Sequence, residues 1–286
     1  MTEARKKVAN VMGWPIGHSL SPRLHGFWIK KYDLNAAYNA RAVKAEDLER
    51  MLRDISAEYL KKDQVFRGTN LTIPLKEVAL DIVDILDPSA ARIGAVNTVV
   101  IGDDGALIGR NTDGIGFIDS LKEHINADSL KGGTAVILGA GGAARAVATA
   151  LVDLGLGHIH ICNRSTDRAK ILADHIGSRA ISLPWDQRSD ILGEADILVN
   201  TTSLGMSGQP PLEISLAKLK TTAVVIDIVY VPLETELLKA ARAQGNLAID
   251  GLGMLLHQAK AGFTAWFGVT PEVDADLRRH VLEGLG

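Results

Sequence analysis

The stretch VILGAGGAARAV, residues 136–147, joins an apolar run to a glycine cluster and then to small residues. Gly139, Gly141 and Ala144 have the spacing G-x-G-x-x-A where an apolar strand should end and a helix begin. In dinucleotide-binding folds the first glycine permits a tight turn, the second lets a pyrophosphate approach the backbone, and the third small residue lets helix and strand pack closely. The stretch predicts such a turn; a tight turn without a ligand is the alternative.

The elements around this turn predict a doubly wound nucleotide-binding domain. Five strand-like runs, TAVILGA, HIHICNR, AISLP, DILVNTT and AVVIDIVY, occur between residues 134 and 230, with helical segments between them. A connecting helix is expected over about residues 116–131, closed by Gly132 and Gly133. We therefore expect a Rossmann-like domain over residues 114–250.

The first half of the chain alternates strand-like and helical patterns as well. Asp104 and Gly105 lie between two apolar runs, which indicates a β-hairpin and fits an antiparallel edge on a mostly parallel sheet. Two helical stretches end the chain, the second opened by Pro271 at a plausible first helical position. We expect a mostly parallel α/β substrate-binding domain formed by residues 1–113 and completed by residues 251–286.

Composition limits the partners. The chain has 286 residues, with 31 Lys and Arg against 34 Asp and Glu, so a net charge of -3 gives no reason to expect nucleic acid or a membrane surface. One cysteine cannot form an internal disulfide, and no apolar run is long enough for a signal peptide or a membrane span. The sequence predicts a cytoplasmic protein with a small-molecule partner.

The end of the second strand of the nucleotide domain bears on the choice of cofactor. NAD sites usually carry an acidic residue there for the ribose 2′-hydroxyl, but this chain has CNRSTDR, residues 162–168. Asn163, Arg164, Ser165 and Arg168 offer a guanidinium and polar donors suited to a 2′-phosphate. This favours NADP, and a solvated loop with incidental arginines is the alternative.

Two charged residues stand out near predicted strand ends. Lys76, in NLTIPLK, follows an apolar run, and a functional ammonium in a cleft needs a partner because burial disfavours its charge. Asp113, in GRNTDGIGF, lies where the first domain passes to the second and could be that partner. From composition alone, a surface lysine and a turn-forming aspartate are the favoured interpretations.

The ordered motifs make a specific resemblance. GWPIGHSLSPRLHG, NLTIPLK, GAVNT, GRNTD, GAGGAARA, NRST, NTTSLGM, DIVYVPLETELL and GLGMLLHQA together resemble the motif series of shikimate dehydrogenases, enzymes of the aromatic amino-acid pathway. The match spans nearly the whole chain. The chain departs from the family at Gly26, where an amide residue is common after the histidine, and Trp14 occupies a variable position.

The resemblance implies a reversible NADPH-dependent reduction of 3-dehydroshikimate to shikimate, with Lys76 and Asp113 as catalytic residues and no metal. Two hydroxyls at alternate positions of an extended segment would converge on the substrate carboxylate; an ST-turn beside Pro22 is the alternative. The residues implied to bind substrate are Ser19, Ser21, Asn70, Thr72, Asn97, Tyr230 and Gln258. The residues implied to bind NADP are Gly139, Ala140, Gly141, Gly142, Ala143, Asn163, Arg164, Ser165, Arg168, Thr201, Thr202, Met206, Gly251 and Met254. Gly253 would let the nicotinamide approach, with a helix-opening turn as the alternative.

Three alternatives stay open. One is a quinate/shikimate dehydrogenase that also uses NAD, and another is a methylene-tetrahydrofolate dehydrogenase, which the serine and GRNTD motifs do not suit. The third is a catalytically dead shikimate or NADP sensor. A homodimer is expected only because two-fold assemblies are common.

Overall fold

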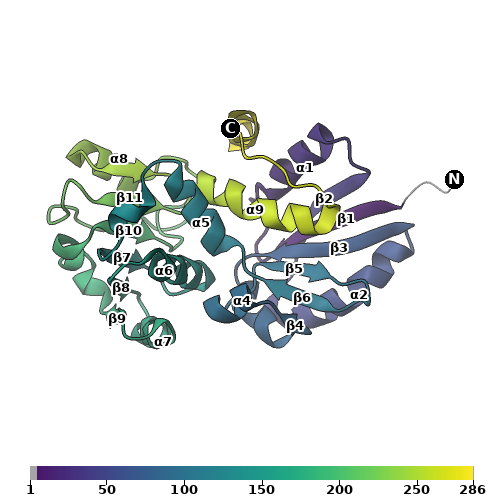
Figure 1. Cartoon of the computed structure of the whole chain (residues 1–286), viewed down its shortest axis with the longest axis horizontal. Coiled ribbons are helices and arrows are strands. Elements are labelled where there is room, and N and C mark those ends of the chain that lie inside the picture. Colours follow the sequence, from purple (N-terminus) through teal and green to yellow (C-terminus); the bar gives the residue numbers. More distant parts are fainter. Residues whose placement is uncertain (1–4, 286) are drawn as a thin grey trace. The chain divides into compact units, whose positions relative to one another are not determined.

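The computed structural model describes residues 5–285, which form two compact units. Unit 1 contains the residues up to Thr112 and those from Leu256 onward, and unit 2 runs from Asp113 to Leu255 (Figure 1). Each unit is a sheet with helices packed against it, so the predicted two-domain α/β fold is confirmed. The predicted limits of the functional domains, 113/114 and 250/251, stay a proposal.

Unit 1 is built on a six-stranded sheet with the order β2-β1-β3-β5-β6-β4. The strands are β1 (Lys6–Gly13), β2 (Ala36–Ala42), β3 (Gln64–Leu71), β4 (Ile85–Leu86), β5 (Thr98–Ile101) and β6 (Leu107–Arg110). The β5–β6 hairpin is the predicted one, and Gly105 takes a positive φ of 87° in its turn. The expectation that the antiparallel strand lies at the edge was wrong. Strand β5 lies inside the sheet, antiparallel to both β3 and β6, and β4 pairs in parallel with β6 at the edge.

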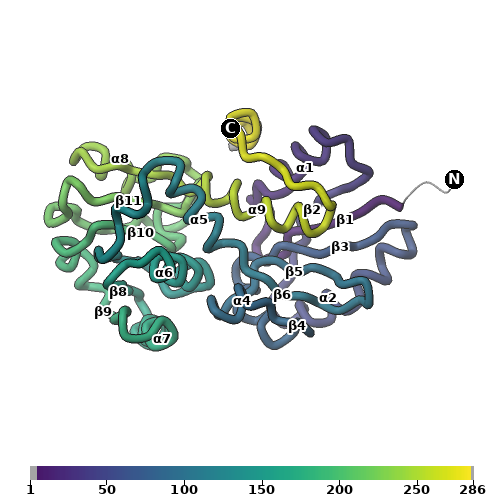
Figure 2. Tube along the Cα trace, in the orientation of Figure 1, coloured from purple at the N-terminus to yellow at the C-terminus, as the bar shows by residue number. Residues whose placement is uncertain are grey.

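Helices cover the sheet of unit 1. They are α1 (Ser21–Lys31), α2 (Leu48–Leu60), α3 (Leu75–Val78), α4 (Pro88–Ile93) and α10 (Ala275–Leu282), with 3₁₀ turns at Ala45–Asp47, Ala79–Asp81 and Glu283–Leu285. The Asp274 side chain accepts a hydrogen bond from the Leu277 amide and so caps α10. Because of this cap α10 begins at Ala275, and Pro271 is not its first residue. Helix α10, which lies beside the C mark in Figure 2, contacts α1.

Helix α9 (Leu252–Phe267) crosses from unit 2 into unit 1, and its last turns are anchored by Trp266. The Trp266 indole N–H donates to the Val99 carbonyl at 3.0 Å. Gly68 leaves room for the ring, since a Cβ atom there would lie 2.3 Å from the indole nitrogen. This close approach fixes the last turns of α9 over strands β3 and β5.

Unit 2 has a fully parallel sheet with the order β12-β11-β10-β7-β8-β9. Its strands are β7 (Thr134–Leu138), β8 (His158–Cys162), β9 (Ala180–Leu183), β10 (Ile197–Asn200), β11 (Val224–Asp227) and β12 (Leu247–Ile249). The order reverses between β7 and β10, as in doubly wound folds. Five strands match the predicted runs, and β12 was missed because three residues carry too little pattern.

The helices of unit 2 are α5 (Asp113–Lys122), α6 (Gly142–Leu154), α7 (Thr166–Ile176), α8 (Glu236–Gln244) and the first turn of α9. Short 3₁₀ turns lie at Ala127–Leu130, Trp185–Arg188 and Ile191–Glu194. The helix predicted over residues 116–131 is therefore two segments. Asn126 separates them, because its side chain accepts from the Asp128 amide and starts a new turn.

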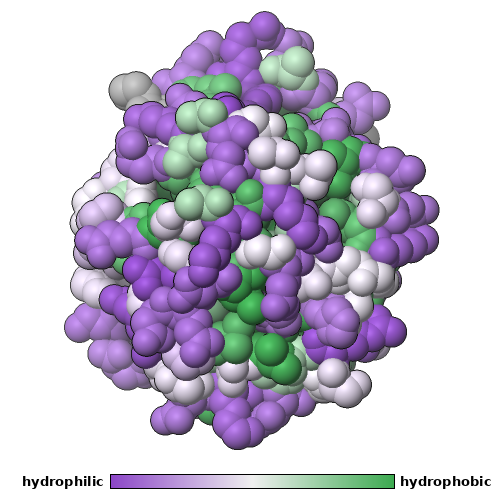
Figure 3. Space-filling model, turned by 90° about the vertical axis from the view of Figure 1, so that its left-hand side faces the viewer, coloured by the Kyte–Doolittle hydropathy of each residue, from purple (hydrophilic) through white to green (hydrophobic). Residues whose placement is uncertain are grey.

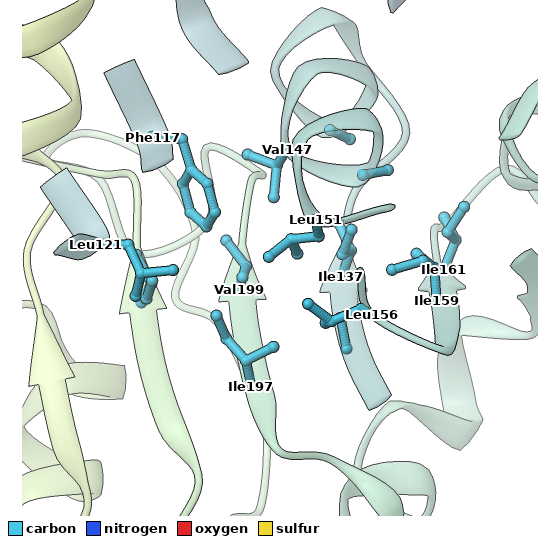
Figure 4. Packing of buried hydrophobic residues seen from close by; sticks show 14 of the residues in the cluster. Phe117, Leu121, Ile137, Val147, Leu151, Leu156, Ile159, Ile161, Ile197 and Val199 are labelled. Atoms are coloured by element: carbon cyan, nitrogen blue, oxygen red, sulfur yellow. The ribbon is translucent and has the colours of Figure 1, made fainter. Parts of the chain in front are cut away.

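One face of this sheet packs under α5 and α6 (Figure 4). Phe117 of α5 and Leu151 of α6 are fully buried against Ile137 of β7 and Val199 of β10. Burial of each such side chain contributes roughly 1.5–3 kcal/mol. Ala144 is also fully buried, so the start of α6 lies close to the end of β7. The packing thus holds the glycine turn between them.

Hydrophilic side chains predominate on the face shown in Figure 3, with hydrophobic ones visible between them. Within residues 5–285, no helix has the length and apolar character needed to span a bilayer.

His25 is a fully buried titratable residue in unit 1. Its ring stacks on Tyr38 with centroids 3.9 Å apart and lies 5.7 Å from Trp266. Burial lowers its pKa from 6.5 to about 3, and the nearby Asn70 side chain opposes this only in part. Neither ring nitrogen has a hydrogen bond of good geometry among the described residues. The fold therefore holds His25 neutral.

We expect His25→Gln to reduce the acid sensitivity of the fold. The unfolded chain binds a proton at His25 below pH 6.5 whereas the folded chain does so only near pH 3, so the wild type loses stability as pH falls through this range. Between pH 7 and pH 5 the free energy of unfolding of the wild type should fall by about 2 kcal/mol more than that of the variant. Equilibrium urea unfolding at both pH values measures this difference. Equal pH dependence in the two proteins would contradict a neutral, buried His25.

Candidate functional site

Asn70 lies near the end of β3, and its side chain links Tyr38 of β2 to Thr98 of β5. Its Oδ1 accepts from the Tyr38 hydroxyl at 2.6 Å. Its Nδ2 donates to the Asn97 carbonyl at 3.3 Å and to Thr98 Oγ1 at 3.1 Å. Asn70 is 5% exposed, so these bonds satisfy an amide that would be costly to bury alone.

Asn97 links the two places where the chain crosses between the units. Its Oδ1 accepts from the Thr112 amide at 2.8 Å, and its Nδ2 donates to Thr112 Oγ1 at 3.0 Å and Gln258 Oε1 at 3.4 Å. Thr112 is the last residue before unit 2, and Gln258 lies shortly after the chain returns. The structure thus brings Asn70, Asn97 and Gln258 of the predicted substrate site into one buried polar network.

The two predicted serines have a different local geometry from the one expected. Leu20 between them has helical φ and ψ of -83° and -5°, and Ser21 already begins α1. Ser19 Oγ accepts from the Ser21 amide at 3.3 Å, which is the ST-turn alternative. The extended segment was therefore wrong, because the helix starts earlier. The Ser21 hydroxyl bonds with Tyr38 and so reaches the Asn70 network.

Thr72 and Lys76 lie just beyond β3. The Thr72 amide donates to the Met12 carbonyl at 2.9 Å, and the Lys76 carbonyl accepts from the Val96 amide at 2.7 Å, which fixes this turn beside the network. Lys76 is half-buried in unit 1, while Asp113, 4% exposed, begins α5 in unit 2. Their pairing stays a prediction.

Sequence reasoning missed Tyr38, Thr98 and Thr112, although each bonds a predicted residue directly. Tyr38 is only 7% exposed, and a buried tyrosine hydroxyl needs a hydrogen-bond partner. A tyrosine inside the apolar run AYNARAV was the available signal. Thr112 immediately precedes Asp113, so it fixes the backbone next to the predicted catalytic carboxylate.

In unit 2 the glycine turn fits a dinucleotide phosphate. Gly139 has a φ of 113°, and a Cβ atom there would lie 2.6 Å from Thr201 Oγ1. Gly141 is the N-cap of α6 and has no side-chain cap, and a Cβ atom built on it would meet nothing within 4 Å. The backbone at Gly141 can therefore be approached closely, at a helix N-terminus that favours an anion. Ala140, Gly142 and Ala143 complete this turn.

The residues after β8 form a cationic turn. Asn163 Nδ2 donates to the Ser165 carbonyl at 2.9 Å, and Ser165 Oγ caps α7 by accepting from the Arg168 amide at 3.4 Å. Arg164 and Arg168 are exposed. Local hydrogen bonds thus shape the turn, and its two exposed guanidiniums give it the positive charge that a phosphate ligand requires.

A buried network organises the loops after β10 and β11. Asp227 accepts from Asn200 Nδ2 at 3.0 Å and from the Thr235 hydroxyl at 2.7 Å. Burial raises the pKa of Asp227 to about 6. Asn200 Oδ1 in turn accepts from the Thr202 hydroxyl at 2.7 Å, so the predicted nicotinamide loop is tied to the core. Sequence reasoning missed Asn200, Asp227 and Thr235.

The other predicted residues of unit 2 lie near these loops in sequence. Thr201 Oγ1 donates to the Leu138 carbonyl at 2.6 Å, which joins the β10 loop to the end of β7. Tyr230 is half-buried, and burial raises its pKa. Met206 is 37% exposed, so packing in the core is not the reason for a methionine at this position.

The glycines near the start of α9 have packing reasons. A Cβ atom on Gly251 would lie 2.2 Å from the Ile228 carbonyl oxygen, and one on Gly253 would lie 2.2 Å from Ser120 Oγ. The expectation that Gly253 leaves room for a nicotinamide ring is therefore wrong as a reason for that glycine, because α5 fills the space. Met254 is 9% exposed and belongs to the core of unit 2.

A parallel, doubly wound sheet with an open glycine turn after its central strand β7 defines a dinucleotide-binding α/β protein. Sequence profiles match three parts of the chain: the shikimate dehydrogenase substrate binding domain at residues 11–99, shikimate / quinate 5-dehydrogenase at 121–242, and the shikimate 5′-dehydrogenase C-terminal domain at 251–279.

Known proteins resemble the chain over almost its whole length. The shikimate dehydrogenase (NADP(+)) of Paramagnetospirillum magneticum is 49% identical over 278 residues, 97% of this chain and 99% of that protein. Shikimate 5-dehydrogenase from Thermus thermophilus, in complex with NADP(H) and shikimate, superposes with a TM-score of 0.83 at 37% identity, covering 97% of this chain and 99% of that one. Quinate dehydrogenase from Corynebacterium glutamicum, in complex with NAD, gives 0.86 at 32% identity, with 97% and 99% covered. The chain belongs to the shikimate dehydrogenase family.

We expect Tyr38→Phe to destabilise unit 1 by about 1–3 kcal/mol, because it leaves the buried Asn70 Oδ1 without its hydroxyl donor. Tyr59→Phe is a matched control: Tyr59 is also buried, but its hydroxyl donates to Asn10 Oδ1 over a longer 3.3 Å. Urea unfolding of both variants compares the losses. If Tyr59→Phe lowers the free energy of unfolding as much as Tyr38→Phe does, the Tyr38–Asn70 hydrogen bond stabilises the fold no more than an ordinary buried hydroxyl does.

Proposed function

We propose that this chain catalyses the reversible reduction of 3-dehydroshikimate to shikimate with NADPH, in aromatic amino-acid (chorismate) biosynthesis. The observation that carries the proposal is the 49% identity, over 97% of the chain, with a protein named shikimate dehydrogenase (NADP(+)). The open glycine turn and the buried amide network support it, because a dinucleotide and a small polyol need these two kinds of site.

NADPH would be held by unit 2. Gly139, Ala140, Gly141, Gly142 and Ala143 would receive the pyrophosphate at the start of α6. Asn163, Arg164, Ser165 and Arg168 would receive the 2′-phosphate, since this turn has two exposed guanidiniums. Thr201, Thr202, Met206, Gly251 and Met254 would line the nicotinamide side. When bound, NADPH supplies the hydride.

The substrate would be held mainly by unit 1. Ser19 and Ser21 would bind its carboxylate, together with Tyr230 from unit 2. Asn70, Thr72, Asn97 and Gln258 would orient the ring hydroxyls. The hydrogen bonds that already hold Asn70 and Asn97 support this assignment, because they fix both amides before a ligand arrives.

Lys76 and Asp113 would act at the substrate ketone. As the carbonyl carbon gains a hydride its oxygen becomes negative, and a protonated Lys76 can stabilise that oxygen and give it a proton. Asp113 would hold the ammonium in position. In the reverse direction Lys76 would take the hydroxyl proton back.

The proposal also covers the domain limits, the location and the assembly of the protein. Residues 1–113 with 251–286 would be the substrate-binding domain and residues 114–250 the NADP-binding domain. The protein would act in the cytoplasm, and a homodimer stays a prediction.

A quinate/shikimate dehydrogenase with NAD use is a second candidate, favoured by the shikimate / quinate 5-dehydrogenase profile at residues 121–242. Steady-state rates with shikimate and quinate, each with NADP and NAD, test both candidates. The proposal expects the highest kcat/KM for shikimate with NADP. Higher kcat/KM for quinate with NAD would favour the second candidate, and no turnover with 3-dehydroshikimate and NADPH would point to a sensor.

We expect Lys76→Ala to lower kcat by roughly 100-fold or more with a smaller change in KM, because the ammonium acts on charge that develops in the transition state. Lys61→Ala, on the exposed end of α2, is the control with the same charge change and should leave both constants unchanged. Steady-state kinetics measures the split. A variant with a raised KM and an unchanged kcat would assign Lys76 to binding alone.

A further inference from the structure

A surface cavity of about 250 Å³ lies in unit 2 beside the turn after β8. Arg164 from that turn, Trp185 and Arg188 from the 3₁₀ turn after β9, and Pro210 and Glu213 from the segment after β10 are among its walls. Only Arg164 had been expected here from the sequence. The other walls come from segments without a recognised motif.

The guanidiniums of Arg164 and Arg188 both line the cavity. Neither Arg164 nor Arg188 has a carboxylate oxygen within 4.0 Å among residues 5–285. Glu213 also lines the cavity, so two positive groups face one negative group there. Like charges that share a cavity repel each other, and a dianion bound between them would remove that cost.

Arg188 is held in a fixed position by the protein backbone and an aromatic ring. Its Nε donates to the Glu213 carbonyl at 2.7 Å and its Nη1 to the Trp185 carbonyl at 2.9 Å, while its guanidinium lies 4.9 Å from the Trp185 ring centre. These bonds use two of its five N–H groups. The Nη2 edge retains donors for a phosphate, and little side-chain freedom remains to be lost on binding.

The sheet order identifies the part of the cofactor that would reach this cavity. The pyrophosphate turn follows β7, β8 is its neighbour, and β9 lies one strand further. Arg164 and Arg188 follow the carboxyl ends of β8 and β9, the edge at which doubly wound sheets bind the adenosine half of a dinucleotide. Arg188 also partly offsets the burial that raises the pKa of Cys162, at the end of β8, to about 11, so its charge acts at that strand end.

We propose that Arg188, held by Trp185 and the Glu213 carbonyl, is a further binding group for the 2′-phosphate of the adenosine end, in the cavity that it shares with Arg164. This inference rests on the proposed use of NADP. It assigns NADP preference to a residue beyond the cationic turn after β8. Arg188 acts on binding and takes no part in the chemical step.

Calorimetry with two nicotinamide-free fragments tests it. Adenosine 2′,5′-bisphosphate and 5′-AMP differ only in the 2′-phosphate. Arg188→Gln keeps an amide that can bond the same carbonyls but removes the charge, so it should weaken binding of the bisphosphate about tenfold and leave 5′-AMP within about twofold. Arg164→Gln should behave in the same way.

Arg179→Gln is the matched control. Arg179 precedes β9 at its opposite end and also reaches two backbone carbonyls, Val152 and Leu156, at 3.4 and 3.5 Å. It should leave both affinities unchanged. Equal losses of both fragments in Arg188→Gln would mean that Arg188 only shapes the loop, and no loss would also overturn the inference. If the wild type itself binds both fragments equally, the proposed use of NADP fails as well.

Discussion

The side chain of Asn97 is the constraint on which the polar network of unit 1 depends. It receives the Thr112 amide on one atom and donates to Gln258 from another, so a single buried amide holds the chain where it leaves unit 1 and where it returns. The carbonyl of the same residue accepts from the Leu71 amide at 2.7 Å and from Asn70. An apolar residue at this position would leave several buried donors without partners, each at a cost of about 1–3 kcal/mol.

In unit 2 a buried carboxylate, rather than an amide, holds the loops by hydrogen bonds. Asp227 accepts hydrogen bonds from Asn200 at the end of β10 and from Thr235 at the start of α8. Asn200 in turn accepts from the Thr202 hydroxyl, so the loop after β10 is also held. Parallel strands end at one edge of a sheet, where their loops have no ladder to order them. Buried polar side chains supply that order. In both units, therefore, the loops that would meet ligands are fixed by amides and acids that need not touch a ligand themselves.

The features predicted correctly from the sequence are those with local causes. The glycine turn at Gly139 requires a positive φ, and the hairpin at Gly105 follows from a two-residue signal, so both can be found from neighbouring residues. Ser19 and Ser21 were assigned to an extended segment because the local sequence does not reveal that α1 begins at Ser21. The start of α10 was predicted at Pro271, but the Asp274 side chain caps the helix three residues later. Tyr38 and Asp227 were missed for another reason. Their partners are 32 and 27 residues away, and only the fold brings them together.

The two candidate sites differ in how they treat polar groups before a ligand binds. The Asn70 and Asn97 side chains of unit 1 already have hydrogen-bond partners, so both amides are oriented before a neutral hydroxyl binds. Arg164 and Arg188 in unit 2 instead have no carboxylate partner within the part of the chain that the structure describes, which costs little because Arg164 is exposed and Arg188 is half-buried at the surface. Water screens such charges at little cost. A phosphate that displaces this water gains electrostatic attraction to both guanidiniums. The proposed orientation of a polyol by hydrogen bonds and the proposed binding of a dianion by charge thus require opposite surroundings, and the two units of the chain offer one of each.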